Sequence, residues 1–158
     1  MNDRLWVLCL AMSLVATAPA WSQASRPAPP GRPSPAPAAP LDAAQTAQVR
    51  QVIEAQLDAF AADDGIAAFS FASPGIRRQF GSPDHFLAMV RQAYPAVYRP
   101  ASVSFLAPRE AAGAVFQPVR LVDGDSRPWV ALYRMQRQSD GTWRIDGCEL
   151  IAQAGTTT

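Results

Sequence analysis

The spacing of apolar residues changes near Ala101, and this change constrains the fold more than any other feature of the sequence. Before that point apolar residues recur every three or four positions, which indicates amphipathic helices, and after it they alternate, which indicates β-strands. Helices followed by an antiparallel meander are typical of an α+β domain rather than of a parallel α/β sheet. We therefore predict N-terminal helices packed on a curved antiparallel sheet of about four strands.

The helical half begins with the signature of a capping box. Asp42 as N-cap and Gln45 three residues later precede an apolar stripe that predicts a long helix over residues 43–62. Asp63 and Asp64 end this helix before a short one over residues 66–71. Adjacent carboxylates at a helix end point about 100° apart, so we expect one of them to cap a helix rather than both to form an acid–base pair.

The motif Phe-x-Ser-Pro occurs twice, at residues 71–74 and 80–83. Each time the serine can cap a helix, and the proline takes the first helical position, where its missing N–H costs nothing. We predict a short helix from Ser73, a longer one from Ser82, and then an extended segment over residues 94–100.

Four strands are predicted, over residues 102–106, 115–122, 129–138 and 142–151. The last two form a hairpin, and Pro118 inside the second strand predicts an edge position or a bulge. Simple alternation puts Trp143 and Ile145 on the face opposite Cys148 and Leu150. Because both faces are then partly apolar, a homodimer through the sheet is a further prediction.

The segments outside this domain have compositions of their own. Residues 1–24 resemble a secretory signal peptide, with cleavage after Ala20 or Ala24, and an uncleaved anchor is the alternative. Residues 25–41 form a proline-rich disordered linker, residues 42–153 a single α+β domain, and residues 154–158 a disordered tail. We therefore expect a periplasmic or secreted protein with no stable membrane insertion after cleavage. Cys148 is then the one remaining cysteine, either a buried small apolar residue or an intermolecular link.

Several chemistries are excluded by composition. The chain has no lysine, which rules out Schiff-base chemistry, pyridoxal phosphate and a phosphate-binding P-loop. Eleven arginines face twelve acids between Asp42 and Glu149, so the basic surplus that nucleic-acid binding needs is missing. One histidine and the scattered acids do not form a metal-ligand pattern, and we expect neither a metal nor a cofactor.

The candidate catalytic residues are His85, Tyr133 and Asp146. His85 is the one imidazole of the chain and hence the ordinary choice for a general base near neutral pH. Asp146 is an alternative acid or base, with Tyr133 as proton donor. For His85, the opposing interpretation is an exposed residue in the first turn of a helix.

The candidate ligand-binding residues are four arginines that could converge on an anion, together with one tyrosine: Arg77, Arg78, Arg91, Arg99 and Tyr98. The alternative is that these arginines are solvated and pair with aspartates of the first helix and the turns. The aromatic residues of the sheet, Trp143 among them, are expected to pack in the core.

Six segments together resemble a bacterial family, the domain of unknown function 4864: residues 69–77, 80–83, 89–95, 97–100, 135–138 and 141–148. The order of elements is also similar to the nuclear transport factor 2-like superfamily, a cystatin-like cone that includes SnoaL-like proteins. That resemblance implies a cavity at the open end of the cone, without naming its ligand.

Many packing motifs beside few catalytic ones favour a non-catalytic domain. We predict an exported protein that binds a small ligand or an envelope partner. The alternative is a small enzyme of the isomerase or cyclase type, with its site inside the cone.

Overall fold

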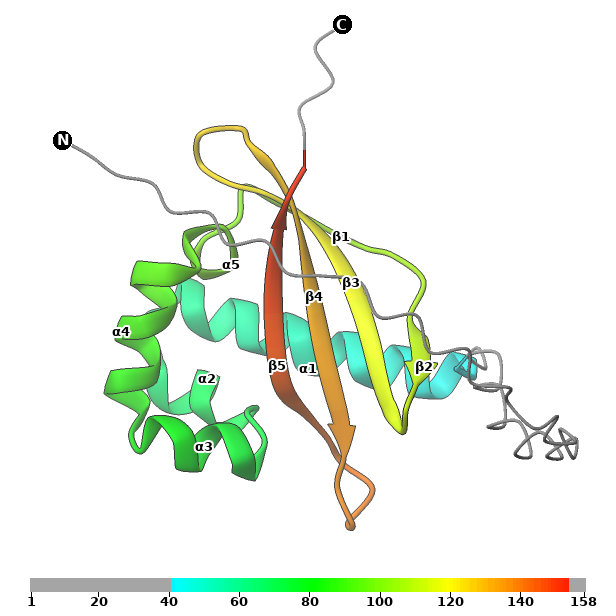
Figure 1. Ribbon diagram of the computed structural model, residues 1–158. Helices are drawn as coiled ribbons and strands as arrows, with labels where there is room; N and C mark the ends of the chain where they lie inside the picture. The colour runs from blue at the N-terminus through cyan, green and yellow to red at the C-terminus, as the bar shows by residue number, and fades with distance from the viewer. Residues whose placement is uncertain (1–40, 154–158) are drawn as a thin grey trace, which may run out of the picture. The chain divides into compact units, whose positions relative to one another are not determined.

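The structure is a computed structural model that describes residues 41–153. The predicted signal peptide, nearly all of the linker, and the tail lie outside the described residues. The elements, in chain order, are α1 (Ala43–Ala61), α2 (Gly65–Ser70), α3 (Pro74–Phe80), α4 (Pro83–Ala93), α5 (Pro95–Tyr98), β1 (Ser102–Phe105), β2 (Arg109–Ala111), β3 (Ala114–Val122), β4 (Pro128–Arg137) and β5 (Trp143–Ala152) (Figure 1).

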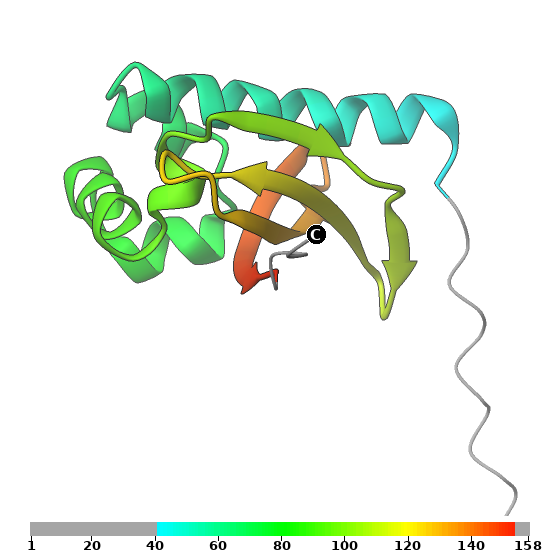
Figure 2. The same cartoon turned by 90° about the horizontal axis from the view of Figure 1, so that it is seen from above.

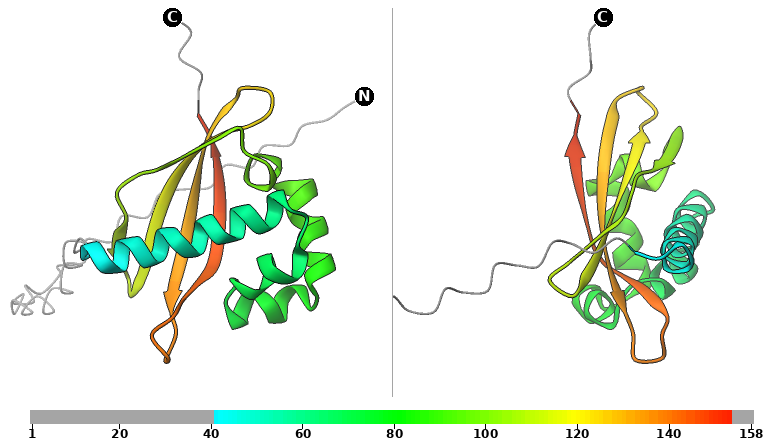
Figure 3. Two further views of the ribbon diagram at one scale, coloured as in Figure 1. Left: turned by 180° about the vertical axis from the view of Figure 1, so that it is seen from behind. Right: turned by 90° about the vertical axis from the view of Figure 1, so that its right-hand side faces the viewer.

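The predicted α+β class is confirmed. Every strand pairing is antiparallel, in the order β1-β3-β4-β5, and β2 pairs with β3 beyond the end of β1. Helix α1 crosses one face of this open sheet, while α2, α3 and α4 cluster beside β5 (Figures 1 and 2). Seen from behind, α1 lies in front of the sheet along its whole width (Figure 3). The core therefore lies between the sheet and the helices.

Helix α1 forms as its sequence predicts. Asp42 Oδ1 accepts a hydrogen bond of 2.7 Å from the Gln45 N–H, and the Gln45 side chain accepts one from the Asp42 N–H, which completes the capping box. The helix buries an apolar stripe against the sheet and α4: Val49, Ile53, Leu57 and Phe60. Asp64 then caps α2 by accepting from the Ala67 N–H at 2.9 Å, so the prediction that one of the two acids is a cap is confirmed.

Both Ser-Pro helix starts are confirmed. Ser73 Oγ accepts from the Ile76 N–H and Ser82 Oγ from the His85 N–H, each at 3.2 Å. Gly81 follows α3 with φ 75°, a conformation that glycine adopts without strain, and this lets the second start follow the first directly.

Two of the predicted element assignments are wrong. The segment over residues 94–100 is not extended, because Pro95 opens the one-turn helix α5; a proline that ends one helix suits the first turn of the next equally well. The sheet has a fifth strand, the exposed three-residue β2, which turns into β3 through Ala112 and Gly113 at positive φ. Three exposed residues carry no apolar alternation, so nothing in the pattern marks β2.

Pro118 lies in β3, which has neighbours on both sides, so the predicted edge position is wrong. It is tolerated because the neighbouring strand is broken there: β1 ends opposite Val119, and β2 begins opposite Phe116. In this gap the Pro118 carbonyl accepts from the Leu106 N–H at 3.0 Å. In an antiparallel ladder the N–H and the C=O of one residue point to the same neighbouring strand. The N–H that proline lacks would therefore also point into this gap, where no described strand needs it.

A β-bulge at Asp146 overturns the predicted faces of β5. Met135 pairs with Ile145, but the preceding Arg134 pairs with Gly147, so Asp146 is an extra residue. One extra residue shifts the alternation of everything that follows it. Trp143, Ile145, Cys148 and Leu150 therefore all face the helices and the core.

The other face of the sheet remains partly apolar. Ile151 is 40 % exposed there, beside the partly buried side chains of Val130 and Leu132. A homodimer through this face stays a prediction.

Candidate functional site

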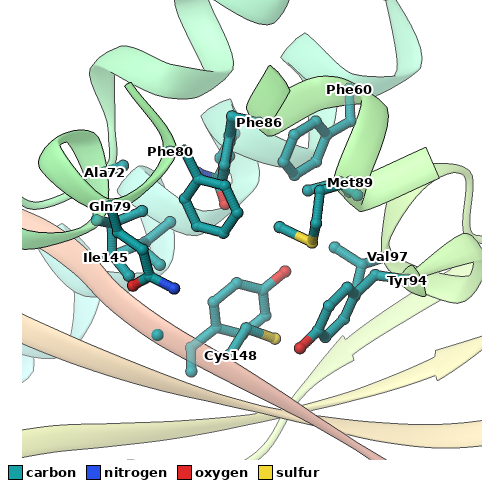
Figure 4. Close-up of a pocket in the computed structure, with 15 residues that line it drawn as sticks. Phe60, Ala72, Gln79, Phe80, Phe86, Met89, Tyr94, Val97, Ile145 and Cys148 are labelled. Atoms are coloured by element: carbon teal, nitrogen blue, oxygen red, sulfur yellow. The ribbon is translucent and has the colours of Figure 1, made fainter. Parts of the chain in front are cut away.

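A cavity of about 190 Å³ lies between the helices and the strands β4 and β5. Its wall consists of Gln56, Phe60, Ala72, Ile76, Gln79, Phe80, Phe86, Met89, Val90, Tyr94, Val97, Tyr133, Ile145, Gly147 and Cys148. Phe80, Phe86 and Met89 lie on the helix side and Cys148 on the strand side (Figure 4). Most of these groups are apolar.

The helix side of the cavity is built by the second Ser-Pro start. This start puts Phe80 at the end of α3 and Phe86 in the first turns of α4, with ring centroids 5.5 Å apart and edges facing rings. The ring centroid of Phe60 on α1 lies 5.9 Å from that of Phe86, with the two rings tilted by 39°. Tilted and edge-to-face pairs of this kind are favourable aromatic packing, so the wall is held by its own contacts.

The strand side is built by the bulge and by the first Ser-Pro start. The Ile145 N–H donates to the Phe71 carbonyl at 2.9 Å, and the Ser73 N–H donates to the Ile145 carbonyl at 2.8 Å. The Ser73 hydroxyl also donates to Asp146 Oδ1 at 2.6 Å. The bulge thus anchors the start of α3, and it turns Cys148 toward the helices and the cavity.

Tyr133 contributes the most deeply buried polar group of the cavity wall. It is 1 % exposed, and its hydroxyl has no hydrogen-bond partner among the described residues. Burial raises the pKa of Tyr133 well above its ordinary value, and the neighbouring Cys148 raises it further. Near neutral pH the hydroxyl is therefore a protonated donor whose polar neighbour, the Cys148 thiol, is only a weak acceptor.

Cys148 lies opposite Tyr133 in the β4–β5 ladder. Burial raises the pKa of its thiol to about 12, with the Glu149 charge as a smaller cause. The reactive form of cysteine is the thiolate, which is scarce at neutral pH when the pKa is this high. Cys148 is thus a polarisable wall group rather than a nucleophile.

Replacing Tyr133 with phenylalanine is expected to raise the free energy of unfolding of the ligand-free protein by about 1 kcal/mol. The ring contacts stay, while the cost of a buried hydroxyl without a partner, about 1–3 kcal/mol, is removed. Urea unfolding of both proteins measures the change. A loss of stability in the variant would show that the hydroxyl has a partner in the folded protein.

The structure separates the three candidate catalytic residues. Tyr133 lines the cavity, but His85 is exposed at the start of α4, with its ring Nδ1 3.0 Å from the Phe80 carbonyl oxygen. Asp146 is held in the bulge by Ser73 and by Arg134, whose Nη1 lies 3.3 Å from its Oδ2. The described residues that line the cavity include no carboxylate, imidazole or guanidinium, so no acid–base pair is assembled there.

Two of the candidate arginines come together with Tyr98 around Asp63. Arg91 Nη2 lies 2.7 Å from Asp63 Oδ1 and Arg99 Nη2 lies 2.9 Å from Oδ2. Both guanidinium groups also contact the Tyr98 ring, at 5.3 and 5.1 Å from its centroid. Hydrogen bonding by Arg91, then the charges of both arginines, lower the pKa of Asp63. An internal carboxylate thus occupies the place where an external anion would bind.

Arg77 and Arg78 lie elsewhere. They are exposed in the last turn of α3, at the opposite end of α4 from α5 (Figure 1), and neither forms an ion pair within residues 41–153. The four arginines therefore do not converge on one site.

The sequence interpretation missed most of the cavity wall. Phe60, Phe86 and Met89 have the helical spacing of ordinary core residues, and Val97 lies in the segment that was predicted to be extended. No local pattern distinguishes a core position from a cavity position. No sequence pattern marked Gln79 as a residue of the cavity wall. The repeated Phe-x-Ser-Pro motif was the useful clue, because it places Phe80 and Phe86 on two short helices that meet.

Neither a metal site nor a membrane-spanning helix is found among residues 41–153. No three histidine, cysteine or acidic side chains gather there in a way that could hold a metal ion. No helix in that part of the chain is both long and apolar enough to cross a bilayer.

Fold and site together define an α+β domain with an apolar cavity between its helices and an antiparallel sheet. The chain belongs to the family described as a domain of unknown function (DUF4864), whose model matches residues 42–158. The predicted family is thereby confirmed. No curated protein matches the sequence significantly.

Proposed function

We propose that this domain binds a small, mainly apolar ligand in the cavity lined by Tyr133 and Cys148, without transforming it chemically. The observation that carries the proposal is a cavity of about 190 Å³ walled mainly by apolar side chains, with one buried hydroxyl that has no well-formed hydrogen bond among the described residues. An apolar cavity of about 150 Å³ is large enough to stay dry and bind benzene. The ligand is therefore about the size of one substituted ring or a short acyl chain.

Binding is favoured over catalysis by the state of the polar groups in the wall. Burial keeps Tyr133 and Cys148 protonated, so neither acts as a base or a nucleophile near neutral pH. The candidate base His85 and the candidate acid Asp146 are engaged outside the wall. An isomerase or cyclase would need one of them inside the cavity.

Two broader proposals accompany this one. The order of elements, helices first and an antiparallel sheet after them, supports a place for the domain in the nuclear transport factor 2-like superfamily. The apolar run and small residues within positions 1–24 support export, so that the ligand would be met in the periplasm or outside the cell.

A substitution that fills the cavity tests the proposed function. Val97 lines the cavity and is 4 % exposed, so Val97→Phe places a ring inside it. The matched control is Val103→Phe, the same chemical change on β1 at a side chain that is 41 % exposed and outside the cavity wall. Toluene serves as the probe, and calorimetry or the shift of the melting temperature measures its binding.

We expect toluene to bind the unmodified protein and the Val103→Phe variant alike, and to bind Val97→Phe at least about tenfold more weakly, which corresponds to about 1.4 kcal/mol. Circular dichroism verifies that both variants are folded. Equal binding by a folded Val97→Phe variant, or no binding by the unmodified protein, contradicts the proposal.

A further inference from the structure

We infer that the ligand of this cavity carries a neutral hydrogen-bond acceptor, a carbonyl oxygen, which receives the hydroxyl proton of Tyr133. The inference rests on the proposed function and narrows it to one chemical class, small neutral carbonyl compounds with an apolar body.

The buried hydroxyl of Tyr133 needs a hydrogen-bond acceptor. Buried polar groups in folded proteins are nearly always hydrogen-bonded, and each exception needs an explanation. Tyr133 is 1 % exposed, so solvent does not supply the missing partner, and the one polar neighbour that interacts with its hydroxyl, the Cys148 thiol, is only a weak acceptor. The wall around it consists mainly of aromatic and aliphatic groups, Phe60 and Val97 among them. A ligand that displaced the wall groups packed on Tyr133 would bring an oxygen to the hydroxyl and satisfy it.

In the hydrogen bond between Tyr133 and the ligand, the tyrosine is the donor. A phenol can donate or accept, but a ligand that only donates would leave the Tyr133 proton unsatisfied. A carbonyl oxygen offers two lone pairs and no proton of its own. An acceptor therefore removes the cost of the buried proton, and a pure donor does not.

Within residues 41–153, the cavity wall offers no counter-charge to a charged ligand. The described residues of the cavity wall include no cationic side chain, and Arg91 and Arg99 are already paired with Asp63. A carboxylate in the cavity would lose its hydration without gaining a counter-charge, which is strongly unfavourable. The acceptor is therefore neutral.

The groups of the cavity wall favour a ligand whose apolar part is a flat ring. Three phenylalanines and Met89 form the helix side of the wall, and Cys148 lies on the strand side (Figure 4). Aromatic edges and polarisable sulfur atoms favour the faces and edges of a flat ring. Acetophenone, a ring with one carbonyl, is a suitable probe.

The test compares two probes of nearly the same shape. Acetophenone has a carbonyl oxygen where isopropenylbenzene has a CH₂ group, and benzoate adds a negative charge. The ratio of the dissociation constants of isopropenylbenzene and acetophenone is measured in the unmodified protein and in two variants. Tyr133→Phe removes the inferred donor, and Tyr94→Phe removes the hydroxyl of the other tyrosine in the wall.

We expect the ratio to fall about threefold to tenfold in Tyr133→Phe, the range that one hydrogen bond gives, and to stay unchanged in Tyr94→Phe. Benzoate is expected to bind at least about tenfold more weakly than acetophenone, because its charge stays unpaired. Comparing ratios cancels the difference in hydration between the two neutral probes.

The outcomes separate the inference from the proposed function. If both neutral probes bind and the ratio is the same in Tyr133→Phe, the cavity binds ligands but the inference is overturned. A ratio that falls only in Tyr94→Phe, or benzoate that binds as tightly as acetophenone, overturns it as well. If neither neutral probe binds the unmodified protein, the proposed function itself fails.

Discussion

Replacing Trp143 with alanine is expected to lower the free energy of unfolding by about 3–5 kcal/mol, the usual cost of truncating a large buried aromatic side chain. Trp143 is 8 % exposed at the start of β5 and belongs to the core between the sheet and the helices. Domains of this size are stable by about 5–15 kcal/mol, so one such substitution removes a large part of the total. Urea unfolding followed by circular dichroism measures it.

The control for Trp143→Ala is a large apolar residue at the surface. Ile66 on α2 is 76 % exposed, and Ile66→Ala should change the stability by no more than about 0.5 kcal/mol. Near-native stability in Trp143→Ala would show that this side chain does not pack in the core.

The two Ser-Pro helix starts provide the second large effect and its own control. Ser82→Ala removes only an exposed helix cap and should cost about 0.5–2 kcal/mol. Ser73→Ala removes a buried cap and also the hydrogen bond of 2.6 Å to the Asp146 carboxylate. A hydrogen bond to a charged group contributes about 1.5–3 kcal/mol, so Ser73→Ala should cost about 2–5 kcal/mol in all.

The difference between the two serine variants therefore reports how strongly the first helix start is fixed to the bulge. Both substitutions delete the same hydroxyl from the same local motif, so cap effects largely cancel in the comparison. Equal losses in the two variants would mean that the Ser73–Asp146 contact adds nothing to stability, and that the strand side of the cavity is held by backbone hydrogen bonds alone.

Local signals in the sequence predicted the helical half of the fold well. In the capping box at Asp42 and in each of the two serine caps, the side chain bonds a backbone N–H only three residues further along the chain. These signals can therefore be read without knowledge of the rest of the chain. Pro95 shows the limit of such signals. The same residue can end one helix and begin the next, and which of these happens depends on the packing of α5.

The sheet was predicted less well because its irregularities depend on partner strands. The bulge at Asp146 exists in the pairing of β4 with β5, and the gap beside Pro118 exists in the pairing of β3 with β1 and β2. The bulge leaves no mark in β5, and Pro118 signals an irregular pairing of β3 without showing which kind. The bulge has the larger consequence, because it reverses the face of Cys148 and so decides one wall of the cavity.

The cavity could not be predicted for a related reason. A side chain such as Met89 or Val97 has the same sequence pattern whether its neighbours fill the space beside it or leave it open. Tyr133 was singled out from the sequence as a proton donor, and the structure places it in the cavity wall. His85 and Asp146, which were predicted as the acid or base to act with Tyr133, both lie outside the cavity wall.

Methyl NMR of the methionines tests the central proposal most directly, namely that a small apolar ligand binds in the cavity. The chain has four methionines; Met89 lines the cavity, whereas Met135 is fully buried in the core outside the wall. On titration with acetophenone, the proposal predicts a saturable shift of the Met89 methyl signal while the Met135 signal stays in place. An unchanged Met89 signal at saturating probe, or equal shifts at both methyl groups, would contradict it.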